Sequence, residues 1–141
     1  PSNSSAASDV YKRQYSICKM STELKRYNVE HRYSDAAVYN GVVYVAGQVP
    51  ETTLDAGIAE QTAEVLAIID RVLAANDSDK TRILMCQIFL KDISEIGEMN
   101  KVWDQWVAAD SKNSPPRATV EAALANPKYR IEIVVTAAQK S

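Results

Sequence analysis

The segment Ser-Pro-Pro-Arg-Ala-Thr-Val-Glu occupies residues 114–121 of the 141-residue chain. Two consecutive prolines hold their own φ at about −65° and push the residue before each of them toward an extended conformation. The chain therefore approaches Arg117 along a stiff path, and Thr119 and Val120 favour a strand after it. A planar guanidinium held on a strand can bind a carboxylate through two parallel hydrogen bonds. Taken alone, the segment also fits the commoner case of a surface arginine at the start of a strand.

The residues after Arg117 predict a hairpin. Strand-forming runs extend from Ala118 to Leu124 and from Tyr129 to Val135, with a turn cluster at 125–128 between them. We expect these runs to pair as antiparallel strands. In that register Arg117 and Glu132 share one face of the sheet and lie about 13 Å apart along the ladder.

Another hairpin is predicted upstream, where Asn40-Gly41 interrupts a run of β-branched and aromatic residues from Ala36 to Val49. The segment from Glu23 to Glu30 has a similar composition and predicts a further strand. Gly47 fits two interpretations, a bulge at the end of a strand or a point where a ligand or another chain approaches the backbone closely.

Two amphipathic helices are predicted, one from Gly57 to Asn76 and one from about Ser94 to Ala109, because apolar residues recur at helical spacing. The nearly continuous apolar run at 82–90 predicts a strand between them that is buried on both faces. Asn100 interrupts the apolar face of the second helix and fits two interpretations, a position in water at the edge of that face or a tie from the helix to a nearby loop backbone.

This order of elements predicts an α+β domain, with both helices on one face of a single sheet. The other face carries apolar residues in the strands at 83–90 and 131–135, so a monomer would expose them to water. Self-association is the simplest way to cover that face.

Composition excludes several classes of protein. Hydrophobic residues make up 46% of the chain, but no apolar run approaches the roughly 20 residues that cross a bilayer. The formal net charge of −2 gives no basic field, which argues against nucleic acid as a partner. Cys18 and Cys86 lie far apart and His31 is the one histidine, so neither a zinc site nor a disulfide framework is expected. A reducing cytoplasm suits this composition.

Residues 1–20 show no strand or helix periodicity, and we expect them to be a disordered or non-native extension outside the fold. Residues 5–14 resemble translated adapter sequence, and Met20 is a plausible native start. The domain is therefore expected to span residues 21–141.

Several of these residues recur together in one known family. In order and spacing the chain resembles the reactive intermediate deaminase (RidA, YjgF-like) family from about Tyr33 to Ala138. The resemblance is carried by Tyr33, Ala46-Gly47-Gln48, Gln61-Thr62, Asn100, Pro116-Arg117 and Ile131-Glu132-Ile133. It implies a chorismate-mutase-like mixed sheet with two helices on one face, assembled as a homotrimer with active sites between subunits.

The resemblance also implies a chemistry, the hydrolysis of enamines and imines such as 2-aminoacrylate to 2-keto acids and ammonia, without cofactor or metal. Arg117 would hold the substrate carboxylate, and Glu132 would orient or activate the attacking water. The substrate-binding positions that it implies are Tyr33, Gly47, Thr119 and Asn100. Ala46 stands where serine is common in the family, so a hydroxyl near the ligand is missing.

Three other functions stay open. Arg117 could capture small carboxylates or amino-acid-like metabolites without turning them over. A ribonuclease activity has been attributed to relatives of the family, but it would need acid and base groups that His31 alone does not supply. An assignment as a metabolic isomerase rests only on the analogy with the chorismate mutase fold.

Overall fold

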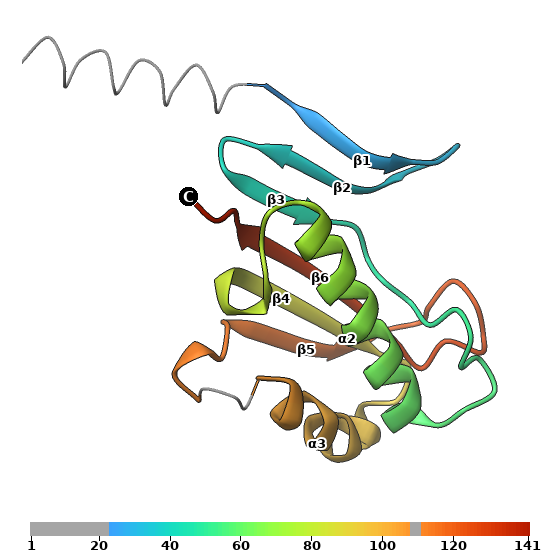
Figure 1. Cartoon of the computed structure of the whole chain (residues 1–141). Helices are drawn as coiled ribbons and strands as arrows, with labels where there is room; N and C mark the ends of the chain where they lie inside the picture. Colours follow the sequence, from blue (N-terminus) through green and yellow to red (C-terminus); the bar gives the residue numbers. More distant parts are fainter. Residues whose placement is uncertain (1–22, 108–110) are drawn as a thin grey trace, which may run out of the picture.

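A computed structural model describes residues 23–107 and 111–141 of the chain. Within these residues six strands form one sheet, in the order β1-β2-β3-β6-β4-β5 (Figure 1). The strands are β1 (Lys25–Val29), β2 (Ser34–Tyr39), β3 (Val42–Val45), β4 (Ile83–Leu90), β5 (Arg117–Glu121) and β6 (Ile131–Ala138), and the two long helices are α2 (Ile58–Ala75) and α3 (Ile96–Val107). The predicted extension at 1–20, including Cys18, and the predicted helix end at Ala109 lie outside the described residues.

The predicted fold class is confirmed, because a mixed sheet packs with one face against both helices (Figure 1). Alternate residues of β6 show how the faces differ. Ile131, Ile133 and Val135 are buried in the core with the apolar side of α2, whereas Glu132 and Val134 on the opposite face are only partly buried. The apolar core therefore lies between the sheet and the helices.

The upstream hairpin is also confirmed. Asn40 and Gly41 have φ values of 55° and 75°, and Tyr39 pairs with Val42 across the turn. Both central residues thus adopt the left-handed conformation that a two-residue hairpin loop requires. Antiparallel pairing of β1 with β2 extends this unit to three strands.

The predicted downstream hairpin is wrong. β5 pairs with β4 in parallel at one edge of the sheet, whereas β6 lies between β3 and β4 and is antiparallel to both. β4 pairs with β5 along one edge and with β6 along the other. Helix α3 forms the crossover that returns the chain parallel to β4, so β5 lies beside β4 and not beside the next strand in sequence.

The predicted common face for Arg117 and Glu132 is wrong as well. Arg117 pairs with Cys86, whose side chain is fully buried on the helix side, whereas Glu132 pairs with Phe89 on the other side. Paired residues direct their side chains to the same face of a sheet, and neighbouring residues of a strand alternate. The two candidate catalytic side chains therefore project from opposite faces of one chain.

β4 is buried on one face only, which corrects the prediction of burial on both faces. Met85 is 48% exposed on the face without helices, and Tyr44 and Val120, on the same face, are 51% and 48% exposed. This helix-free face carries the exposed apolar surface that the sequence predicts. Within the described residues, no helix combines the length and hydropathy needed to cross a membrane.

Candidate active site

Arg117, at the start of the edge strand β5, is held by two side chains from α3. Its Nη1 donates a hydrogen bond to Oδ1 of Asn100 over 2.9 Å, and its guanidinium carbon lies 5.1 Å from the ring centroid of Trp103. Asn100 therefore contacts the arginine side chain and not a loop backbone. The aromatic ring and the amide orient the guanidinium, and within the described residues most of its five donors stay free for a ligand.

The surroundings of Arg117 include a cysteine and a threonine on the same face of the sheet. Burial raises the pKa of the Cys86 thiol to about 12, although the nearby charge of Arg117 acts to lower it. The thiol therefore stays protonated and is a poor nucleophile at neutral pH. Thr119, the second residue after Arg117, has a buried hydroxyl without a hydrogen-bond partner in the described part of the chain. That hydroxyl can still accept or donate a bond to a ligand.

Glu132 lines a separate cleft of about 420 Å³ on the helix-free side. Tyr33 and Gly47, two of the predicted substrate-binding residues, line it too, as does Ala46. The remaining lining residues are Asp35, Gln48, Val49, Glu51, Ala125 and Tyr129.

The Glu132 side chain packs against the backbone at Gly47. A Cβ atom built at position 47 would lie 2.9 Å from both Cδ and Oε2 of Glu132, which is shorter than real Cβ contacts. Two backbone hydrogen bonds between Gln48 and Ile133, of 2.8 and 3.0 Å, hold the two segments at this spacing. The backbone of Gly47 is thus closely approached, but by a side chain of the same chain, whereas the approach of a ligand or another chain stays a prediction.

The Glu132 cleft is acidic. Asp35, Glu51 and Glu132 contribute three carboxylates, and no lysine or arginine is among its lining residues in the described ranges. A small carboxylate substrate would be repelled there unless a cation came from elsewhere. Arg117 of the same chain cannot supply it, because it projects from the opposite face of the sheet.

Gln61, one of the residues that carry the family resemblance, positions the start of β6. Its side chain is fully buried on α2, accepts a hydrogen bond from the backbone N–H of Arg130 over 2.8 Å and donates one to the carbonyl of Lys128 over 2.9 Å. It also donates to the carbonyls of Thr53 and Leu54. A glutamine within an apolar helix stripe was the available signal, because such a group has to find buried partners. Here it fixes the start of β6, which carries Glu132.

Glu64, one turn further along α2, holds the loop that carries Glu51. Its carboxylate accepts hydrogen bonds from the backbone and hydroxyl groups of Thr52 and Thr53 over 2.7 to 3.1 Å. Burial acts to raise the pKa of Glu64, but these hydrogen bonds outweigh it and lower the pKa to about 2. The loop is therefore fastened to a charged carboxylate at neutral pH.

The structure thus divides the predicted site into two groups. Tyr33, Gly47 and Glu132 lie together at one cleft, and Arg117, Asn100 and Thr119 lie together at the edge strand. Throughout the part of the chain that the structure describes, no three His, Cys, Asp or Glu side chains gather closely enough to hold a metal ion.

Comparison with known proteins places this arrangement in a family. Residues 23–139 match the family model described as endoribonuclease L-PSP. A RutC family protein of Haemophilus ducreyi is 48% identical over 115 residues, which cover 82% of this chain and 96% of that protein. A rat protein named 2-iminobutanoate/2-iminopropanoate deaminase is 29% identical over 112 residues, covering 76% of this chain and 80% of the rat protein.

A solved structure agrees with these sequence matches. A protein of Neisseria meningitidis, described as a member of the YjgF protein family, superposes with a TM-score of 0.80 at 45% identity, over 86% of this chain and 98% of that one. The fold, the family model and the relatives together show that the chain belongs to the YjgF/RidA/RutC superfamily.

Proposed function

We propose that this protein hydrolyses reactive enamine and imine intermediates of the 2-aminoacrylate type to 2-keto acids and ammonia, without a cofactor. The observation that carries the proposal is the placement of the Glu132 carboxylate over the backbone of Gly47, in a cleft open to a small ligand. The name of the rat relative supports the reaction class. Arg117, oriented by Asn100 and Trp103, is suited to bind the α-carboxylate of the substrate.

The reaction needs little from the protein beyond orientation and proton transfer. The imine carbon is already electrophilic, and an enamine such as 2-aminoacrylate becomes an imine by moving one proton to its methylene carbon. Glu132 accepts a proton from water as the oxygen bonds to the imine carbon and the C=N π electrons move to nitrogen, and it passes that proton to the nitrogen, giving a carbinolamine. Glu132 then takes the proton of the carbinolamine hydroxyl and returns it to the nitrogen, the C–N bond breaks as the C=O bond forms, and ammonia leaves the 2-keto acid behind. Fixing the reactants together supplies much of the acceleration.

A complete site needs both the Arg117 group and the Glu132 group, and contact between two subunits is the simplest way to bring them together. Arg117 stands on the edge strand and projects away from the face that carries Glu132, so one chain does not direct both toward a single small substrate. The exposed apolar surface around Tyr44, Met85 and Val120 offers an area for self-association. We infer that Arg117 of one subunit meets Glu132 of another in a homotrimer, which is the assembly that the family resemblance implies.

Subunit complementation tests this proposal. Arg117→Ala and Glu132→Gln are each expected to be inactive, and the two are unfolded and refolded together. Shared sites predict that mixed trimers regain part of the activity through interfaces that carry both intact residues. Native mass spectrometry establishes that mixed assemblies have formed. Mixed trimers without recovered activity would refute sharing, and normal turnover by Arg117→Ala alone would refute the role of the arginine.

A non-catalytic carboxylate-binding protein is the second candidate, favoured by one observation. Ala46 lines the Glu132 cleft and provides no hydroxyl beside the ligand. The discriminating measurement is whether the purified protein removes 2-aminoacrylate faster than its spontaneous decay. The family description names an endoribonuclease, but three carboxylates in the cleft would repel a phosphate backbone.

A further inference from the structure

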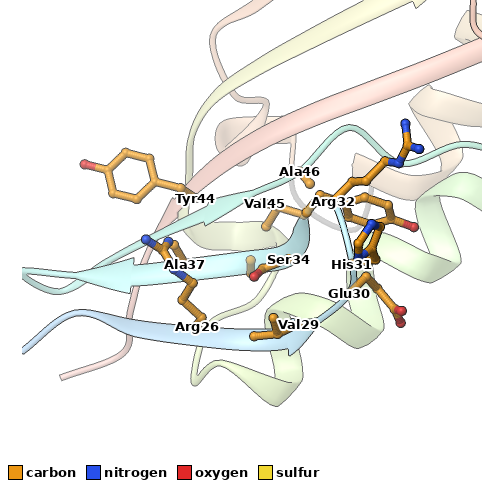
Figure 2. A pocket seen from close by; sticks show the side chains of 12 residues that line it. Arg26, Val29, Glu30, His31, Arg32, Ser34, Ala37, Tyr44, Val45 and Ala46 are labelled. Atoms are coloured by element: carbon orange, nitrogen blue, oxygen red, sulfur yellow. The ribbon is translucent and has the colours of Figure 1, made fainter.

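A second cleft, of about 550 Å³, lies at the turn between β1 and β2 (Figure 2). Tyr33 and Ala46 line both this cleft and the Glu132 cleft. The two clefts therefore meet at these two residues, of which Ala46 presents only a single methyl group.

This second cleft is rich in cationic side chains, in contrast to its neighbour. Arg26 and Arg32 are its two cationic side chains, and among the described residues that line it Glu30 is the one carboxylate. Figure 2 shows Arg26 and Arg32 at opposite ends of the cleft, with Ser34 between them. Across residues 23–107 and 111–141, no side chain forms a hydrogen bond or ion pair with either guanidinium. Both arginines can therefore bind an anion without giving up an existing partner.

Cross-strand pairing explains why a hollow exists here. Arg26 pairs with Ala37, and Ala37 pairs with Tyr44, so the three side chains form a row across β1, β2 and β3. The small Ala37 in the middle of this row leaves the space between the two long side chains unfilled. Arg32 lies in the adjoining turn and directly precedes Tyr33, a residue that lines both clefts.

We propose that this second cleft is a subsite for a second carboxylate, with Arg32 as its binding residue, and that the substrate class includes imino acids derived from dicarboxylic amino acids. The inference rests on the proposed function, since it places the imine carbon beside Glu132. A dicarboxylic substrate then has one arginine for each carboxylate, Arg117 for the α-carboxylate and Arg32 for the side chain. The unpaired guanidinium also offsets the repulsion from the acidic Glu132 cleft.

The test compares two substrates in three proteins. The imines of aspartate and alanine are generated in situ by amino-acid oxidases, and kcat/KM is measured for wild type, Arg32→Gln and the matched control Arg71→Gln. Arg71 is an exposed arginine on α2 and lines neither cleft. The ratio of kcat/KM for the dicarboxylic over the monocarboxylic imine should fall about 10-fold or more in Arg32→Gln, mainly through KM. Arg71→Gln should keep the wild-type ratio.

The outcomes separate this inference from the proposed function. Turnover of the monocarboxylic imine with an unchanged ratio in Arg32→Gln overturns the subsite and leaves the deaminase proposal standing. Absence of turnover of both imines by the wild-type protein refutes the deaminase proposal. In that case calorimetry compares the binding of 2-oxoglutarate and of 2-oxobutanoate to wild type and to Arg32→Gln. Selective weakening of 2-oxoglutarate binding by Arg32→Gln supports the subsite, and equal binding to wild type and variant overturns it. Unchanged melting temperatures show that the variants are folded.

Discussion

Replacing Gly47 by alanine tests the arrangement on which the proposed chemistry depends. The new Cβ would lie 2.9 Å from Cδ and Oε2 of Glu132, whereas ordinary van der Waals contacts are 3.4–4 Å. The carboxylate therefore has to move by roughly 0.5–1 Å. A displacement of about 1 Å at a reacting centre can cost about 100-fold in rate. We expect Gly47→Ala to lower kcat/KM for 2-iminobutanoate by roughly 10- to 100-fold.

Stability should change far less than activity. Glu132 is only partly buried and its side chain can rotate away, so the clash is relieved without moving the backbone. We expect the free energy of unfolding to fall by less than about 1 kcal/mol. The matched control is Gly97→Ala in α3, where a new Cβ would have no neighbour within 4 Å. Alanine there should stabilise the helix by about 0.5–1 kcal/mol and leave turnover unchanged.

The assay generates 2-iminobutanoate in situ with an amino-acid oxidase and follows the formation of the 2-keto acid. Turnover is compared for wild type, Gly47→Ala and the control Gly97→Ala, with Glu132→Gln giving the background rate. Wild-type kcat/KM in Gly47→Ala, or an equal loss in Gly97→Ala, would refute this reasoning.

Three other predictions follow from side-chain contacts. Asn100→Ala should raise the KM for imino acids about 10-fold in steady-state kinetics with little change in melting temperature, because Arg117 loses the acceptor that orients it; an unchanged KM would contradict this role. Gln61→Met should lower the free energy of unfolding by about 2–3 kcal/mol in urea titrations, since the Arg130 N–H and the Lys128 carbonyl lose their buried partner; a loss below about 0.5 kcal/mol would show that other groups replace it. Glu64→Gln should cost about 1–2 kcal/mol at pH 7, after allowance for solvent screening. Folding lowers the pKa of Glu64 from 4.5 to about 2, so this stabilisation is complete above about pH 4.5 and disappears as the pH falls through about 2. A difference in unfolding free energy between wild type and Glu64→Gln that increased at lower pH would contradict this prediction.

Local patterns in the sequence determined most of the elements. Asn40-Gly41 predicts the β2–β3 hairpin because both residues readily adopt positive φ, and the apolar periodicity of 58–75 predicts α2. Pro116 and the β-branched residues after Arg117 predict that β5 begins at this arginine. Local patterns did not assign roles to the candidate site residues. Those roles came from the resemblance to a family.

Tertiary structure alone decided the order of the strands and the grouping of the site. The sequence of 118–135 is equally compatible with a hairpin, but β5 and β6 each pair with β4, and nothing local encodes which edge a strand occupies. The contact between Gly47 and Glu132 likewise joins residues that are distant in the chain. Pairing between distant segments depends on the burial of the whole sheet, and it is this pairing that directs Arg117 and Glu132 to opposite faces.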